Sequence, residues 1–197
     1  MGLIAKTTGG DFELVPEGMH VARCYRVIDM GTQFNEQYQK SFHKILISWE
    51  FPEEKMSDGR PFAITKKYTL SLHKKATLRS HLESWRGRKF TDEEAQGFDI
   101  SKLMGATCYI NVVHSKTGDN TYANVAAITP LPKNLLCPVV INPPVILNLD
   151  VDLFDRAVFD ALSEKLKDIV RATPEYKNIE IGDKTIPSND SEGNPPF

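Results

Sequence analysis

Two stretches carry the strongest structural pattern in this sequence: SFHKILISWEF (residues 41–51) and FAITKKYTLSL (62–72), which a short turn separates. In both, apolar and aromatic side chains gather on one face. The first stretch places these residues on that face: His43, Ile45, Ile47, Trp49 and Phe51. A period of two predicts a β-strand with one buried face. Pro52 ends the first strand and MSDGRP supplies turn residues, so we expect a long β-hairpin.

The flanking segments have clear patterns of their own. Leu78, Leu82 and Trp85 recur at spacings of four and three, which predicts a helix over 74–87 that Gly87 ends. The remaining elements are a strand at 19–30, a loop at 31–39, a short helix after Thr91, and strands at 106–115 and 121–128.

This order of elements predicts a mainly β domain with helices. Three strands, a helix and two further strands are typical of a five-stranded OB-fold barrel with a helical insert between strands 3 and 4. An SH3-like barrel also has five strands but lacks so large an insert. We therefore expect an OB-fold domain over residues 1–135.

The rest of the chain divides into two parts. Residues 136–173 hold a Pro-rich segment and a C-terminal amphipathic helix, expected at 152–172, with one apolar stripe formed by Phe154, Val158, Leu162, Leu166 and Ile169. Residues 174–197 are expected to be a flexible acidic tail with a Pro-Pro-Phe tip. The sequence leaves open whether the chain forms a homo-oligomer.

The composition is that of a globular protein. The chain has 197 residues, of which 41% are hydrophobic and 25% charged, with no apolar run near the roughly 20 residues that span a bilayer. No signal peptide is expected. Its three cysteines, Cys24, Cys108 and Cys137, are far apart, so we expect reduced thiols and a cytoplasmic protein.

The charge is uneven along the chain. Residues 1–135 carry 18 Lys and Arg against 15 Asp and Glu, whereas residues 136–197 carry 6 against 11, which gives +3 and −5. A mildly basic domain with an acidic arm suits a protein that binds a polyanion.

No pattern typical of catalysis is present. The five histidines are scattered, no Cys or His pair has metal-ligand spacing, and neither a phosphate-binding glycine loop nor a G-x-S-x-G motif occurs. We therefore expect no enzyme activity, no catalytic residues, no metal and no cofactor.

Aromatic and basic residues on the expected strands suit binding of single-stranded nucleic acid. Rings can stack on bases and ammonium groups can follow the phosphates, whereas the alternatives are core packing for the rings and a solvated face for the lysines. The candidate DNA-binding residues are Arg23, Tyr25, Arg26, Phe42, Lys44, Lys66, Lys67, Tyr68, Lys74, Lys75, Tyr109 and Tyr122. A basic run, Arg86, Arg88 and Lys89, either contacts phosphate or complements the end of its helix.

Four long blocks resemble one known family. FELVPEGMHVARCYRVIDMGTQ, YTLSLHKKATLRSHLESWRGRKFT, GFDISKLMGATCYINVVH and YANVAAITPLPK are similar to bacteriophage-encoded proteins regarded as OB-fold single-stranded DNA-binding proteins. The likeness covers most of residues 10–175. It implies a role in phage DNA replication or recombination in the cytoplasm of a bacterial host, and it implies no catalytic residues.

The tail resembles the tip of bacterial single-stranded DNA-binding proteins, which end in acids and a Pro-Phe that docks on replication and repair enzymes. The residues that match are Asp190, Glu192, Pro195, Pro196 and Phe197, although the acids are fewer than in the bacterial pattern. The resemblance implies host or phage replication and recombination proteins as partners, besides single-stranded DNA. Two rival functions stay open: a module that recruits or inhibits a host enzyme, and a nuclease or recombinase subunit.

Overall fold

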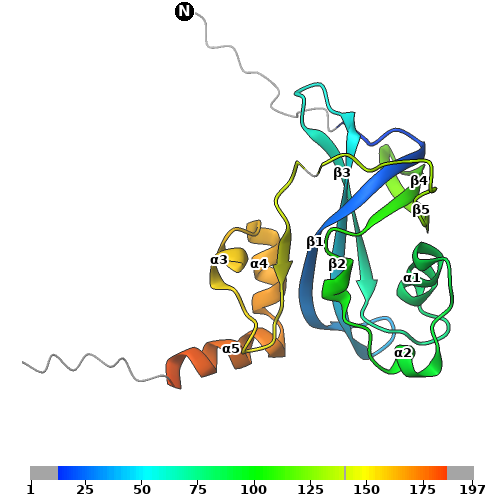
Figure 1. The fold of residues 1–197 in the computed structure, drawn as a ribbon. Helices are drawn as coiled ribbons and strands as arrows, with labels where there is room; N and C mark the ends of the chain where they lie inside the picture. Colours follow the sequence, from blue (N-terminus) through cyan, green and yellow to red (C-terminus); the bar gives the residue numbers. More distant parts are fainter. Residues whose placement is uncertain (1–12, 140, 186–197) are drawn as a thin grey trace, which may run out of the picture.

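The computed structural model describes residues 13–139 and 141–185, and its first half is a sheet with a helical insert (Figure 1). The elements are β1 (Gly18–Asn35), β2 (Lys40–Lys55), β3 (Pro61–Thr69), α1 (Thr77–Arg86), α2 (Asp92–Gln96), the 3-10 helix η1 (Ile100–Leu103), β4 (Thr107–Thr117) and β5 (Asn120–Thr129). The expected order of three strands, helix and two strands is confirmed.

The strands form one sheet in the order β3-β2-β1-β4-β5. Strand β1 is long enough to change partner: Gly18–Arg23 pairs with β4, and Arg26–Ile28 pairs in parallel with β6 (Val145–Leu147). In the described residues no ladder joins β3 to β5, so the sheet is open there and the expected closed barrel is not formed by backbone pairing. One hydrogen bond crosses this gap, from Lys66 Nζ to the Val125 carbonyl oxygen at 2.9 Å.

The inner face of β2 builds the larger core. Here the residues expected from the alternation, Ile45, Ile47, Trp49 and Phe51, are buried. Helix α1 covers them with its own apolar stripe, Leu78, Leu82 and Trp85. Full burial of such side chains contributes about 1.5–3 kcal/mol each, so this face fixes the position of α1 and of the loop that leads to it.

The outer face of β1 and β2 builds a second core with the C-terminal part of the chain. Here β6 and the helices α3 (Arg156–Asp160), α4 (Glu164–Arg171) and α5 (Pro174–Thr185) pack on the sheet. The buried residues of this core are Ile28, Met30, Leu46, Leu147, Leu149, Phe159, Leu162, Val170, Tyr176 and Ile179. The outer face is therefore covered over β1 and β2 by the C-terminal helices.

Two expected boundaries on the C-terminal side are wrong. The single helix over 152–172 is instead α3 and α4, interrupted around Leu162. The flexible tail was expected from residue 174, yet 174–185 is helix α5. The physical reason is local. Pro174 suits the first position of a helix, and the Thr173 hydroxyl caps that helix by accepting a hydrogen bond from the Tyr176 backbone N–H at 3.4 Å. The side chains of Tyr176 and Ile179 are buried, so one face of the helix packs against the protein.

The loop expected at 31–39 is also wrong for its first half. Strand β1 continues to Asn35, and pairs from Thr32 with His43 to Asn35 with Lys40 extend the hairpin. Gly31 lies in the irregular part of the ladder with φ +64°. It also lies against α5: a Cβ atom placed on Gly31 would be 2.7 Å from Thr173 Cβ.

Replacing Gly31 by Ala is expected to destabilise the protein more than the same change at Gly118. Gly118 has a similar φ of +60° but open space around it. Both variants bear the left-handed backbone penalty, about 1–2 kcal/mol. Only Gly31→Ala also overpacks, which adds about 1–3 kcal/mol. Thermal or urea unfolding measures the difference, and equal losses would contradict close packing of Thr173 on β1.

No helix in the described part of the chain is both long and apolar enough to cross a bilayer.

Candidate nucleic-acid interface

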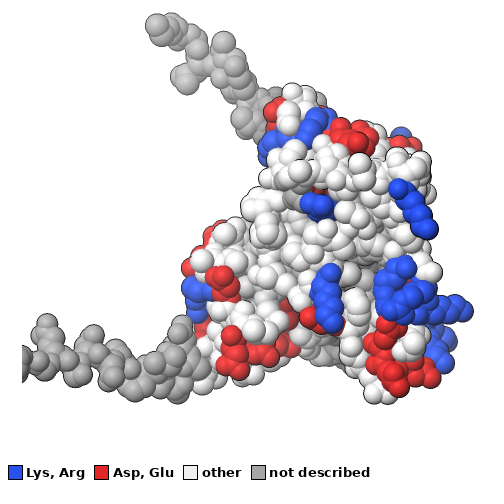
Figure 2. Space-filling view, in the orientation of Figure 1, with Lys and Arg blue, Asp and Glu red and all other residues white. Residues whose placement is uncertain are grey.

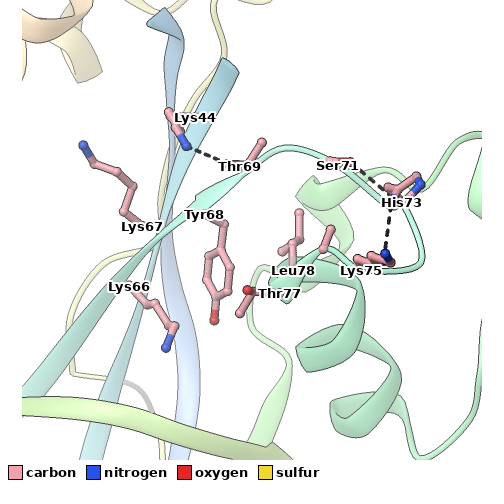
Figure 3. Close-up of a pocket in the computed structure, with 11 residues that line it drawn as sticks. Lys44, Lys66, Lys67, Tyr68, Thr69, Ser71, His73, Lys75, Thr77 and Leu78 are labelled. Atoms are coloured by element: carbon pink, nitrogen blue, oxygen red, sulfur yellow. Dashed lines mark hydrogen bonds between the residues drawn. The ribbon is translucent and has the colours of Figure 1, made fainter. Parts of the chain in front are cut away.

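A cavity of about 620 Å³ lies between the end of β3 and the start of α1 (Figure 3). Among the described residues that line it, four are lysines and one is a histidine, and none is Asp or Glu. The lining consists of Lys44, Lys66, Lys67, Tyr68, Thr69, Ser71, His73, Lys75, Ala76, Thr77 and Leu78. We call this cavity the basic groove.

The strand pleat arranges the lysines around the edge of the sheet. Lys67 and Lys44 lie on one side of β3, whereas Lys66 and Tyr68 lie on the other (Figure 3). Because β3 is an end strand of the sheet, nothing in the ladder separates the two sides. Lys75 completes the groove from the loop before α1. Consecutive residues of one edge strand thus direct positive charge to both of its sides.

In the part of the chain that the structure describes, no carboxylate pairs with the lysines of the groove. Lys44 Nζ donates to the Thr69 hydroxyl at 2.6 Å. Burial and then the neighbouring charge of Lys67 lower the pKa of Lys44, and burial lowers the pKa of Lys66. Both pKa shifts show that the surroundings disfavour the charged forms of these two lysines. A bound anion would reverse this effect.

The start of α1 presents further groups that suit an anion. Its N-cap is Ala76, which provides no side-chain hydrogen bond, and no acid lies in its first turn. N-cap positions usually hold Ser, Thr, Asp or Asn, which accept from the first backbone N–H groups. Here those N–H groups and the positive end of the helix dipole border a groove lined by lysines, as Ala76, Thr77 and Leu78 are part of its wall.

A set of aromatic side chains leads away from the groove to the turn between β1 and β2. The Phe42 ring lies 5.0 Å from Lys44 Nζ, and the Tyr38 ring packs edge-on against Phe42 with centroids 6.3 Å apart. Tyr38 is 61% exposed and Phe34 is 60% exposed. We call Phe34, Tyr38 and Phe42 the hairpin aromatics. Sequence reasoning missed Phe34 and Tyr38 because both fall in the stretch interpreted as a loop, although two rings in so polar a stretch were a usable signal.

Tyr68, one of the predicted DNA-binding residues, is buried. Its side chain is 3% exposed, and its hydroxyl is 2.9 Å from His81 Nδ1. Burial raises the pKa of Tyr68 well above its usual range. The side chain belongs to the larger core, although Tyr68 is also among the residues that line the groove.

The basic and aromatic residues of β1 also lie apart from the groove. Arg26 Nε donates to the Ser48 hydroxyl at 3.1 Å, and β6 pairs with the backbone beside it. Arg23 and Tyr25 are half-buried. The strand opposite them carries Glu50, a fully buried side chain that accepts hydrogen bonds from the backbone of 141–142. The C-terminal segment therefore crosses the region where a strand-face site was expected.

The remaining predicted residues are dispersed. Tyr109 is half-buried on β4, and Tyr122 is 50% exposed near the turn between β4 and β5. Lys74 is exposed and adjoins Lys75 in the chain. The structure thus gathers Lys44, Lys66, Lys67 and Lys75 around one groove and connects Phe42 to it through Lys44.

The basic run after α1 has a structural role. Arg86 Nη2 and Arg88 Nη2 each lie 2.6 Å from Glu94 Oε1, and Arg86 stacks 4.4 Å from the Phe90 ring. The hydrogen bonds from Arg88 and Arg86 lower the pKa of Glu94 to about 2. Figure 2 shows the same arrangement, with Lys and Arg over α1 directly beside Asp and Glu over α2. The run is paired with acids, unlike the groove.

A histidine and two acids hold α5 on the hairpin. His43 Nε2 lies 2.6 Å from Asp29 Oδ1, and His43 Nδ1 lies 3.6 Å from Glu175 Oε1. The hydrogen bond to Asp29 raises the pKa of His43, against the effect of burial. Burial raises the pKa of the Glu175 carboxyl, but hydrogen bonds from Thr32 outweigh this effect and lower the pKa below its usual value. The contact between α5 and the hairpin is therefore strongest when His43 is charged and both acids are ionised.

Stability is expected to depend on pH through His43. Because the pKa of His43 is raised in the folded state, its contribution to the unfolding free energy is complete below about pH 6.5. This contribution disappears as the pH rises through the folded-state pKa. Glu175 has the opposite sign and loses its contribution in acid. The difference in unfolding free energy between the wild type and His43→Gln should therefore be larger at about pH 6 than at about pH 9. A constant difference across this range would contradict the ion pairs.

Neither the comparison with protein-family models nor the comparison with curated proteins gives a match for this chain. In the ranges 13–139 and 141–185, no group of three or more His, Cys, Asp or Glu is placed to hold a metal ion. The tail residues expected to dock partners, Asp190, Glu192, Pro195, Pro196 and Phe197, lie outside the described residues.

Proposed function

We propose that this protein binds single-stranded DNA through the basic groove and the hairpin aromatics, as a non-catalytic protein of phage replication or recombination. The observation that carries the proposal is a groove of about 620 Å³ lined by four lysines and one histidine and by no acid. A chain of phosphates supplies the charge that this groove lacks, and its binding releases counterions from the DNA.

The position of the groove supports the proposal. The strand order β3-β2-β1-β4-β5, with α1 between β3 and β4, is compatible with an OB-type barrel that is opened between β3 and β5. OB-folds bind oligonucleotides at strands 2 and 3 and at the loop between strands 1 and 2. Here the same elements hold Lys44, Lys67 and the hairpin aromatics, while the C-terminal helices cover the face of β1 and β2.

Unpaired bases suit the aromatic part of the site better than duplex DNA does. Exposed rings such as Tyr38 and Phe34 can stack only on bases whose faces are accessible. Stacking contributes roughly 1–3 kcal/mol per base and accepts any base. We therefore expect binding that depends strongly on salt and weakly on sequence.

One observation favours a second candidate function. Strand β3 ends the sheet, and its edge is bordered by the lysines. An acidic peptide could add to this edge as an extra strand and pair its carboxylates with the same ammonium groups. A module that binds a host enzyme would use such a contact.

Titration of the full chain with oligo-dT tests the proposal. We expect binding at about 50 mM salt that weakens steeply by about 200 mM, and a further loss in Tyr38→Ala because stacking is removed. Tyr109→Ala, a half-buried residue outside the groove, is the matched control. Absence of binding at the lower salt concentration would overturn the proposal and favour the peptide-binding alternative.

A further inference from the structure

A second cavity, of about 270 Å³, lies next to the basic groove and has a different character. Its walls are largely apolar, formed by residues such as Ile45, Leu70, Phe98 and Leu147. Its polar groups include two carboxylates, Asp29 and Asp99, together with Ser101 and Asn148, and no Lys or Arg lines it. We call it the acidic pocket.

Residues that are neighbours in the chain line the two cavities. Lys44 lines the groove and Ile45 lines the pocket, and Thr69 and Leu70 divide in the same way. The backbone N–H of Leu70 donates to the His43 carbonyl oxygen at 2.8 Å, which holds this junction together. Residues that are adjacent in the chain thus line both cavities at the end of β3, so a polymer bound among the lysines could reach the pocket.

The chemistry of the pocket excludes phosphate and suits a base. The Asp99 carboxylate would repel an anion, and the charge of His43 is already paired with Asp29 at 2.6 Å, so the backbone of a bound strand would stay among the lysines. The apolar walls suit the faces of an unstacked ring, and the carboxylates accept hydrogen bonds. Asp99 accepts through Oδ1 from the Ser101 backbone N–H at 2.9 Å and from its hydroxyl at 2.6 Å. No described residue donates to Asp99 Oδ2, so this oxygen can accept from a ligand.

Asp29 completes the polar rim from the opposite element. Its Oδ1 accepts from the Gly31 backbone N–H at 2.8 Å and contacts His43 at 2.6 Å, so its carboxylate is fixed in position. A pair of carboxylates with fixed positions distinguishes bases by their exocyclic groups. Adenine, cytosine and guanine carry an exocyclic amino group that donates, whereas thymine has none and offers only its N3–H, between two carbonyl oxygens that a carboxylate repels.

We propose that the acidic pocket takes one unstacked base of the strand bound in the basic groove and prefers a base with an exocyclic amino group over thymine. This inference rests on the proposed function and adds a specificity to it. Hydrogen bonds to charged groups are worth about 1.5–3 kcal/mol, so one correctly placed amino base should raise affinity about tenfold or more.

The test compares an oligo-dT of fixed length with the same oligomer in which one thymine, at each position in turn, is replaced by cytosine. For the wild type we expect one position at which cytosine raises affinity about tenfold. Asp99→Asn should abolish this gain while leaving the affinity for plain oligo-dT unchanged or slightly higher. Leu70→Trp, which fills the pocket, should have the same effect, and circular dichroism with thermal unfolding verifies that both variants fold.

The possible failures are distinguishable. Binding of oligo-dT that Lys67→Glu weakens, with no position at which cytosine helps, would overturn the pocket inference and leave the proposed function standing. A cytosine gain that persists in both Asp99→Asn and Leu70→Trp would overturn the assignment to this pocket. Absence of any binding to the wild type would overturn both proposals.

Discussion

Reversing the charge of Lys44 and Lys67 together, as Lys44→Glu with Lys67→Glu, is expected to weaken oligo-dT binding about 30-fold or more at about 50 mM salt. The two ammonium groups lie on one side of β3, and both lysines line the basic groove. Each lost phosphate contact should also lower the slope of log affinity against log salt by about 0.7. Titrations at several salt concentrations measure both quantities.

A charge reversal of the same size elsewhere provides the control. Lys165 is exposed on α4 and does not line the groove, so Lys165→Glu should change the affinity and the salt slope little. Thermal unfolding of the double variant should remain close to the wild type because Lys67 is exposed on the end strand β3 and Lys44 is only half-buried. An equal loss of affinity in both variants would show that only net charge matters and would contradict binding of the strand in the basic groove.

Replacing Phe159 by Ala is expected to lower the unfolding free energy by about 3–5 kcal/mol. Phe159 is 1% exposed in the second core, with its ring 4.8 Å from the Tyr176 ring and 5.8 Å from the Phe154 ring. Its loss leaves a cavity between the C-terminal helices and the outer face of β1 and β2. Urea unfolding at fixed temperature measures the change.

The same variant separates stability from binding. Because Phe159 belongs to the second core and does not line the basic groove, the affinity for oligo-dT should stay near the wild-type value under conditions where the variant is folded. Ala161→Gly, at an exposed position after α3, is a control for the effect of a change in this segment. A loss under about 1 kcal/mol for Phe159→Ala would contradict a shared core.

The alternation of residues 41–51 was sufficient to predict the hairpin and its inner face because burial of every second side chain leaves a direct trace in the sequence. The helix over 77–86 left an equally direct trace through Leu78, Leu82 and Trp85. The C-terminal part was harder. Ser48 and Glu50 are both fully buried on the outer face, and a polar residue in a strand ordinarily indicates a solvated face. Only the hydrogen bonds from residues 141–142 explain the burial of Glu50.

The candidate site was predicted in part for similar reasons. Lys66, Lys67 and Lys75 were found because basic residues cluster in two short runs, and Lys44 was found because the alternation of its strand places it on the face opposite Trp49. For Tyr68 the alternation, which places it on the apolar face of Phe62 and Ile64, was a better guide to its position than the neighbouring lysines of the run KKY. The separation of Arg23 and Arg26 from the groove depends on β6, a three-residue strand that pairs with β1 from more than a hundred positions away. No local pattern carries that information.

Photo-crosslinking of an iodouracil-substituted oligo-dT to the full chain, followed by peptide mapping, tests the central claim most directly. If the basic groove and the hairpin aromatics bind the strand, crosslinks should fall within residues 34–44 and 66–78 and should disappear in the Lys44→Glu, Lys67→Glu double variant. Crosslinks confined to Tyr25, Tyr109 or the C-terminal helices, with full intensity in the double variant, would contradict it.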